Sequence, residues 1–283
     1  MIRPHASALA LILSATLLVA LAGAFPVASQ EEPRADAAAA APDRVPVLVE
    51  MFTSQNCPNS PAGESILTRL DRTQPIEGVR VVPLAFHVPY WDSAGWKDPF
   101  GHSGHQWRQN QYSKRSRSGD VYTPQFVIDG DTGLSGRSEG AVKKAIVTAA
   151  KVPKATIRLE ARTSREEDPP RTVRIGIDVT GIPAELRGPA GQEAEILLAV
   201  AERNLVTDIG GGKNKGVHVE QTGVVRAWMP LGHVNAQGDA IFPPEYLITL
   251  DPSWKLSDLT AVVWIQQKPA GRVLGLGTLA LGN

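Results

Sequence analysis

The chain has 283 residues, of which 42% are hydrophobic, so it is long enough for two domains with their own cores or for one large domain. Lysine and arginine together number 29, as do aspartate and glutamate, and the formal net charge at pH 7 is therefore zero. A chain without a basic excess lacks the electrostatic footprint of a nucleic-acid-binding or membrane-surface protein, and we exclude both as main partners.

The N-terminal segment has the pattern of a secretory signal. Arg3 and His5 precede an apolar run over residues 8–22, which ends in small residues. We expect residues 1–24 to be a signal peptide and residues 25–44 an alanine- and proline-rich linker, and we expect a periplasmic or secreted protein. An uncleaved N-terminal anchor is the alternative, and it would be the protein's attachment to a membrane.

Cys57, the only cysteine, lies at a predicted strand-to-helix junction. Residues 47–52 form a buried apolar strand, and Ser60 and Pro61 are the expected cap and first position of a helix. The amide groups and the dipole at a helix N-terminus favour a reactive thiolate. One cysteine in an exported protein cannot form an internal disulfide, which favours a functional thiol over an inert, half-buried one.

A second strand and a long aromatic connection follow. Residues 79–86 are apolar, and Pro83 within them indicates an edge position or a bulge. Residues 87–107 are rich in proline, glycine, histidine and aromatic residues, and we expect them to fold over the Cys57 turn. Either they line a pocket or they form a lid that packs only against itself. The candidate binding residues in this loop are His87, Tyr90, Trp91, Asp92, Trp96 and Asp98.

Downstream, the spacing of the hydrophobic residues changes from a mixed helix and strand pattern to strand alternation near residue 155. Helical spacing is expected at residues 106–116 and 138–152, and between them a strand at 121–128 contains Thr123-Pro124 and pairs with residues 134–136. From residue 155 onwards, seven short strands alternate with turns rich in proline and glycine, which is typical of an antiparallel β-sandwich. We therefore predict an α/β domain over residues 45–153 and an all-β domain over 154–283.

Three blocks carry a resemblance to a known family: TSQNCPNSP, AFHVPYWDSAGWKDPF and VYTPQFVIDG. They are similar to a widespread family of secreted proteins, a domain of unknown function, with a thioredoxin-like domain. The later GGGKNKGVHVEQTGVVRAW is similar to the C-terminal segment of that family. The resemblance implies a thioredoxin-like fold over the α/β domain, in which Thr123 and a cis Pro124 face the thiol of Cys57.

The sequence departs from that family at Ser60, where members usually have a second cysteine. The resemblance thus implies catalytic roles for Cys57, Ser60 and Pro124, but an internal dithiol cycle is excluded because no second thiol exists. Cys57 can still attack a disulfide of a protein or of a small molecule, and an external thiol must then release the mixed disulfide. We therefore predict a monothiol reductase or isomerase-type protein that needs no cofactor.

Two other functions remain open. The first is a redox-inactive module that binds a peptide or a partner protein through a groove at Pro124 and the aromatic loop. The second is copper or zinc binding by His102 and His105, three residues apart, together with Cys57 or His87. We assign no metal ligands, because glycine-flanked histidines in a loop are usually solvated and nothing in the spacing fixes the geometry.

Overall fold

The computed structural model describes residues 44–116, 119–136, 138–163, 172–184, 194–243 and 245–282. The predicted signal peptide and, except for Arg44, the predicted linker lie outside these residues. Among the described residues, no helix is long and apolar enough to cross a membrane. The helices are α1 (Ser60–Thr73), α2 (Ser103–Arg115) and α3 (Glu139–Ala149), with short 3-10 turns at Pro89–Ala94 (η1), Gly212–Asn214 (η3) and Leu256–Asp258 (η4).

The strands of the described chain follow the helices in two groups. The first group, interleaved with the helices, is β1 (Val45–Thr53), β2 (Val79–His87), β3 (Gln125–Ile128) and β4 (Thr132–Ser135). The second group is β5 (Ala155–Thr163), β6 (Thr172–Thr180), β7 (Ala194–Glu202), β8 (Leu205–Asp208), β9 (His218–Gln221), β10 (Val224–Val234), β11 (Ala240–Ile241), β12 (Glu245–Thr249), β13 (Leu259–Gln267) and β14 (Val273–Ala280).

β1 is the strand around which the N-terminal elements assemble. It pairs in parallel with β2 and antiparallel with β3, and β4 continues the sheet beyond β3. Its alternate residues face opposite sides: Val47, Val49 and Met51 pack with the apolar faces of α1 and α3, whereas Leu48 and Phe52 pack with Tyr112 of α2. A strand covered by helices on both faces is buried on both, which explains why β1 is buried from Val47 onwards and is mostly apolar, with Glu50 as the charged exception.

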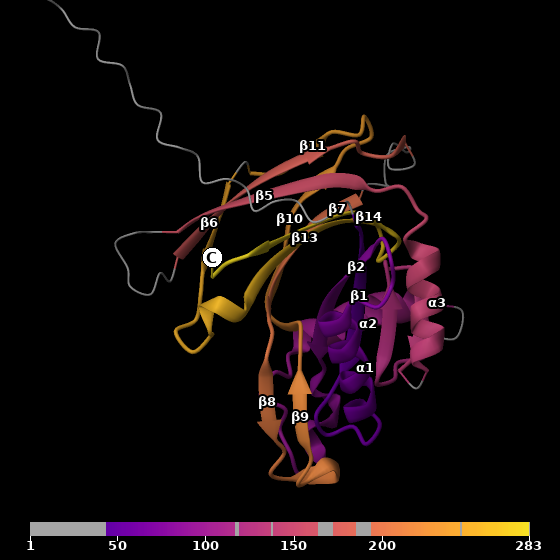
Figure 1. Ribbon diagram of the computed structural model, residues 1–283, viewed down its shortest axis with the longest axis vertical. Coiled ribbons are helices and arrows are strands. Elements are labelled where there is room, and N and C mark those ends of the chain that lie inside the picture. Colours follow the sequence, from indigo (N-terminus) through magenta and orange to yellow (C-terminus); the bar gives the residue numbers. More distant parts are fainter. Residues whose placement is uncertain are drawn as a thin grey trace, which may run out of the picture. The chain divides into compact units, whose positions relative to one another are not determined.

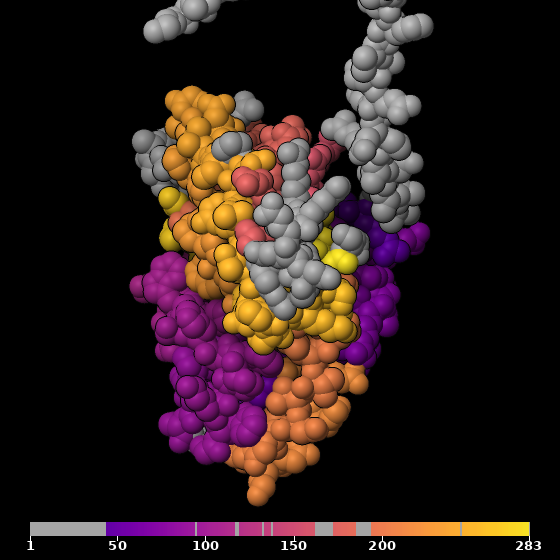
Figure 2. All heavy atoms as spheres, turned by 90° about the vertical axis from the view of Figure 1, so that its left-hand side faces the viewer, coloured from indigo at the N-terminus to yellow at the C-terminus, as the bar shows by residue number. Residues whose placement is uncertain are grey.

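The predicted fold class, a thioredoxin-like domain plus a separate β-sandwich, is wrong. All strands except β8 and β9 belong to one twelve-stranded mixed sheet in the order β12-β6-β5-β14-β13-β7-β10-β2-β1-β3-β4, with β11 beside β10. The two groups of strands also share a core, in which Leu48, Phe86 and Val127 pack with Leu197 and Trp264. Figure 1 shows the strands running on from one group to the other, and Figure 2 shows the surfaces of the two groups in direct contact.

The prediction failed because β7 and β13 were taken for alternating strands. Their residues 196–201 and 261–265 are buried on both faces: Ile196, Leu198 and Val200 enter the core of the second strand group, while Leu197 and Ala199 enter the shared core. A strand of a two-layer sandwich would expose every second residue. These near-continuous apolar runs were the signal of a strand in the interior of a larger structure.

The junction between the two groups is short, and Pro83 limits it. β10 meets β2 through Val224 opposite Ala85, with the amide of Ala85 donating to the carbonyl of Gly223 at 2.7 Å. Amides two residues apart point to the same edge of a strand, so proline at position 83 leaves that edge without a donor. Before Pro83 the edge is closed by the side-chain amide of Gln74, which accepts from the Val81 amide at 2.8 Å and donates to its carbonyl at 3.1 Å.

A buried charged cluster fastens α2 between the two strand groups. Arg108 of α2 is 4% exposed and donates through Nε to Oε1 of Glu50 in β1 at 2.5 Å, and through Nη2 to Oε1 of Gln266 in β13 at 3.0 Å. The Tyr112 hydroxyl donates to the other carboxylate oxygen of Glu50. Four aromatic rings surround the guanidinium at 5.1–5.5 Å, those of Phe86, Tyr112, Trp228 and Trp264.

The remaining two strands form a separate ribbon. β8 and β9 pair antiparallel and lie beside α1 (Figure 1). The Thr68 hydroxyl of α1 donates to the carbonyl of Glu220 at 3.2 Å, and Arg72 pairs with the Glu220 carboxylate at 2.6 Å. The glycine-rich segment at 210–212 connects the two strands of this ribbon.

Candidate functional site

Cys57 lies in a tight turn between β1 and α1. Its amide donates to the carbonyl of Ser54 at 3.1 Å, and its own carbonyl accepts from the amide of Ser60 at 3.1 Å. The Ser60 hydroxyl accepts from the Ser54 amide at 3.3 Å, which closes the turn across its base. Pro61 follows at the start of α1, as predicted, although the residue in the cap position is Asn59 rather than Ser60. The turn therefore holds both Cys57 and Ser60 almost fully buried, each 1% exposed.

The peptide bond between Thr123 and Pro124 is cis and lies beside the thiol. The Sγ of Cys57 is 3.4 Å from the carbonyl oxygen of Thr123, to which it donates. The Pro124 ring is buried between two glycines: a Cβ on Gly63 would lie 2.8 Å from it, and one on Gly136 would lie 2.6 Å away. The ring thus fills a tight space in the protein and presents no open face, which does not favour a peptide groove at this position.

The aromatic loop covers the turn from one side. The Nε1 of Trp91 donates to the Thr123 hydroxyl at 2.8 Å, and the carbonyl of Trp91 accepts from the side-chain amide of Asn56 at 2.8 Å. Tyr90, the preceding residue, is half-buried, and burial raises the pKa of its hydroxyl. Tyr90 and Trp91 are therefore brought to Cys57, Thr123 and Pro124 as the loop residues that adjoin the candidate thiol site.

The η3 turn covers Cys57 from another side. This contact was not predicted from the sequence. Asn214 is buried and donates through Nδ2 to the carbonyls of Gln55 and Cys57, both at 2.8 Å. The amide of Lys213 donates to Oδ1 of Asn56 at 2.8 Å, and its ammonium lies 4.8 Å from the centre of the Trp91 ring. The KNK motif at 213–215 stood beside the glycines, but no local pattern relates it to a turn more than 150 residues earlier.

Behind the turn lies a buried polar cluster that includes His87 and Asp98. The Nδ1 of His87 is 2.7 Å from Oδ2 of Asp98, which also accepts from the Gln55 amide at 2.8 Å. On the other side, Nε2 of His87 is 3.8 Å from Oε1 of Glu64, a residue of α1 that accepts from the Thr53 hydroxyl. The sequence-based prediction did not include Glu64, although it lies three residues before Leu67 and therefore on the buried face of α1.

The charges in this cluster support one another. Burial alone would disfavour the charged imidazolium, but the carboxylates of Asp98 and Glu64 outweigh it and raise the pKa of His87. His87 in turn outweighs the effect of burial on Asp98 and lowers the pKa of that carboxyl. For Glu64 burial prevails and raises the pKa. The cluster thus holds a His87–Asp98 ion pair that fixes the Cys57 turn through Gln55.

The other predicted binding residues support the loop. Trp96 donates through Nε1 to Oε1 of Gln55 at 3.0 Å, and Oδ1 of Asp92 accepts from the amide of Asp98 at 3.1 Å. Within the described chain, neither side chain forms a hydrogen bond with Cys57 or Pro124. Both therefore hold the aromatic loop in place around Gln55.

His102 and His105 do not converge with the thiol. His102 caps α2 by accepting from the Gly104 amide at 3.1 Å, and the ring of the buried His105 is 2.9 Å from the His87 carbonyl. Burial lowers the pKa of His105 to about 4, so this ring is neutral at pH 7. Nowhere in the described chain do three or more His, Cys, Asp or Glu side chains form a group that could hold a metal ion.

The arrangement suits chemistry at one sulfur. The thiol is enclosed by the aromatic loop, the Thr123–Pro124 bond and the η3 turn, and a few hydrogen bonds close this cover. Pro58 and Asn59, the two residues after Cys57, are exposed. A modest opening of either cover would bring the thiol to solvent, whereas the polar cluster behind it is fixed by burial.

Comparisons with known proteins identify a family and a fold. A protein of Agrobacterium tumefaciens, known from a crystal structure determined by structural genomics, is similar with a TM-score of 0.62 and 20% identity, covering 86% of this chain and 97% of that one. A domain of the outer membrane lipoprotein Omp28 from Porphyromonas gingivalis covers 45% of this chain and 95% of its own, with 12% identity and a TM-score of only 0.26. None of the curated proteins matches this sequence. The family model of DUF1223, a protein of unknown function, matches residues 48–266, and the chain therefore belongs to the DUF1223 family.

Proposed function

We propose that this protein is an exported thiol protein in which Cys57 forms a reversible mixed disulfide with a protein or small-molecule partner. The observation that carries the proposal is the placement of the chain's only cysteine in a turn before a helix, beneath two separate loops that cover it. An inert cysteine needs no such arrangement, because it packs as a small apolar side chain. Export is supported by the signal-like N-terminal sequence.

The proposed reaction is thiol–disulfide exchange. The Cys57 thiolate attacks one sulfur of a partner disulfide, the sulfur–sulfur bond breaks, and the second sulfur leaves with the electron pair as a thiolate. A new disulfide now joins Cys57 to the partner. An external thiol then attacks the Cys57 sulfur in that bond, the partner leaves as its second thiolate, and Cys57 is left in a disulfide with the external thiol. A second external thiol attacks the outer sulfur of that disulfide and releases the Cys57 thiolate. Over the cycle the partner disulfide is reduced and two equivalents of external thiol are oxidised to their disulfide.

Access to the thiol is expected to control the rate. In the closed state the S–H group of Cys57 donates to the Thr123 carbonyl, and the thiol is shielded from solvent. Two hydrogen bonds from Asn214 hold the η3 cover to the turn, and each is worth at least about 0.5 kcal/mol. Their loss should raise the population of the open state several-fold.

The test is the reaction of the protein with glutathione disulfide, followed by mass spectrometry. We expect one glutathione adduct per chain, none in Cys57→Ser, and release of the adduct by excess glutathione. Asn214→Ala should react several-fold faster than the wild type. Asn235→Ala is the matched control, because the Asn235 side chain bonds only within its own exposed turn, and its rate should be unchanged.

Two results would contradict the proposal. A folded wild-type protein that forms no adduct over hours would remove Cys57 as a reacting thiol. An adduct that forms equally fast in wild type and Asn214→Ala would show that the η3 turn does not govern access. A circular dichroism spectrum of each variant separates these outcomes from misfolding.

A further inference from the structure

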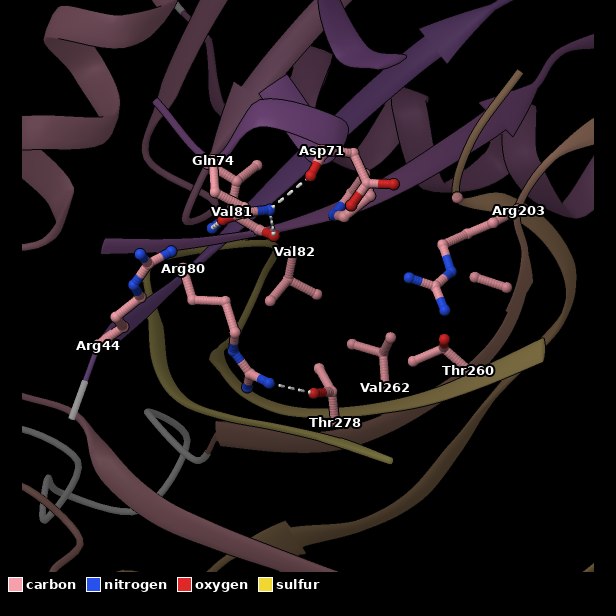
Figure 3. Close-up of a pocket in the computed structure, with 13 residues that line it drawn as sticks. Arg44, Asp71, Gln74, Arg80, Val81, Val82, Arg203, Thr260, Val262 and Thr278 are labelled. Carbon is pink, nitrogen blue, oxygen red and sulfur yellow. Dashed lines mark hydrogen bonds between the residues drawn. The ribbon is translucent and has the colours of Figure 1, made fainter. Parts of the chain in front are cut away.

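A second site lies where the two strand groups separate. Because Pro83 has no amide to donate, β10 leaves β2 beyond Ala85, and a cleft of about 380 Å³ opens between β2 and the strands β7, β13 and β14. The cleft has the size of a small-molecule site. Figure 3 shows the residues that line it.

The floor of the cleft is apolar and the rim is cationic. Val82, Ala201 and Val262 are at most 5% exposed and form the floor together with Pro83. Arg44 and Arg80 lie on one side of the opening and Arg203 on the opposite side, across Val82 and Val262 (Figure 3). The two cationic ends thus face each other over an apolar middle.

The arginines at the two ends have donors to spare. Arg80 makes one hydrogen bond, from Nη1 to the Thr278 hydroxyl at 2.7 Å, which fixes its guanidinium at the rim. Within the described chain, no carboxylate lies within 4.0 Å of the side chain of Arg44, Arg80 or Arg203. A guanidinium has five N–H donors in a planar fork that matches a carboxylate. Each cationic end of the cleft can therefore bind one carboxylate.

The acidic groups nearby are already engaged. Asp71, which also lines the cleft, accepts from the Thr222 hydroxyl at 2.5 Å. Asp258, whose carbonyl accepts from the amide of Arg203, has its carboxylate bonded to Asn204 at 2.9 Å and Lys255 at 2.8 Å. Neither carboxylate forms an ion pair with an arginine of the cleft, although Asp71 places one negative charge in its lining.

From this arrangement we propose that the cleft binds a dianion with an apolar middle, of the class of aliphatic α,ω-dicarboxylates. One carboxylate lies against Arg44 and Arg80, the methylene chain lies on Val82 and Val262, and the second carboxylate meets Arg203. This site is separate from the Cys57 turn, since none of its lining residues contacts that turn in the described chain. The inference therefore does not depend on the proposed thiol function.

The test is calorimetric titration of the full mature protein with dicarboxylates from hexanedioate to dodecanedioate. At least one length should bind roughly tenfold more tightly than the monocarboxylate of the same length, because a charge-assisted hydrogen bond is lost with one carboxylate. Galactarate, the tetrahydroxy analogue of hexanedioate, should bind more weakly than hexanedioate because the floor is apolar. The corresponding alkane diamines should not bind.

Variants locate the binding. Arg80→Gln and Arg203→Gln should each weaken the binding of the tightest dicarboxylate roughly tenfold. The double variant should bind that dicarboxylate no more tightly than the wild type binds a monocarboxylate. Arg174→Gln is the matched control, since Arg174 is an exposed arginine of β6 that pairs with Glu245, and it should leave binding unchanged. Cys57→Ser should also bind normally.

Three outcomes would overturn the proposal: no dicarboxylate binding at millimolar concentration, monocarboxylates binding as well as dicarboxylates, or binding that persists in both cleft variants. Urea unfolding of each variant shows whether a loss of binding reflects a loss of fold.

Discussion

Replacement of Arg108 by methionine should destabilise the whole structure, because Arg108 joins β1, α2 and β13. Methionine keeps most of the apolar contact with the four surrounding rings but removes the charge. Glu50 of β1 would then be a buried carboxylate with no cation, and breaking a buried pair in this way costs about 3–5 kcal/mol. Since 1 kcal/mol shifts the melting temperature of a chain this size by about 2–4 °C, we expect a fall of roughly 10 °C.

The assay is urea unfolding followed by tryptophan fluorescence, since Trp228 and Trp264 contact Arg108. Glu50→Gln in the Arg108→Met background removes the orphaned charge and should recover at least about 2 kcal/mol of the loss. The exposed Arg174 again supplies the control, because Arg174→Met breaks a surface pair and should cost less than about 1 kcal/mol.

Two results would refute the reasoning about Arg108. A loss below about 1 kcal/mol would mean that the cluster is solvated in solution and behaves as a surface pair. A variant that unfolds in two separate transitions, with the N-terminal elements lost first, would show that the two strand groups are stable apart and that the shared core does not couple them.

Three other predictions follow from local geometry. Ser60→Cys places a second thiol three residues after Cys57 at the start of α1, and oxidation should give an internal disulfide; mass spectrometry that finds two free thiols under oxidant would contradict it. Asp129 is buried, which raises its pKa to about 6 from an ordinary 3.8, so the folded state binds the proton more tightly and the free energy of unfolding should fall as pH rises between these values. Asp129→Asn should abolish that slope of up to about 3 kcal/mol, and an unchanged pH profile in urea titrations would count against it. Gly223→Ala should cost about 2–4 kcal/mol, because φ is +62° and the new Cβ would lie 2.5 Å from a carbonyl oxygen of β2, whereas Gly78→Ala, with φ +69° and open space, should cost about 1 kcal/mol.

Local patterns predicted the elements of the chain better than their assembly. The strand expected at 47–52 is β1, the strand at 79–86 is β2, and the helix at 138–152 is α3, with boundaries shifted by one to three residues. Each of these has a start or stop signal in the sequence itself, such as Ser138, which caps α3 by accepting from the amide of Ala141. The joining of the two strand groups into one sheet has no such signal. In the sheet they meet through one pairing of distant segments, Val224 with Ala85.

In the candidate site, too, some residues were predicted from the sequence and others are shown only by the structure. The turn of Cys57 before a helix is a short local pattern, whereas Thr123–Pro124 was placed beside it only through the resemblance to a family. Asn214 could not be placed there, because a hydrogen bond across 157 residues leaves no mark on its neighbours. The His87–Asp98 pair was assigned to a pocket wall, but both residues are buried, and only the structure shows that they fix the turn from behind.

The side-chain amide of Gln74 protects β2 from strand addition by other protein chains. A strand edge with free N–H and C=O groups is a template on which a second chain can add a strand and begin to aggregate. Pro83 leaves such an edge on β2 without a neighbouring strand. At Val81 the side-chain amide of Gln74 bonds to both the backbone N–H and the C=O, as a neighbouring strand would. The cleft is therefore open to a small solute but closed to an extended polypeptide, and the break in the sheet does not become a point of growth between molecules.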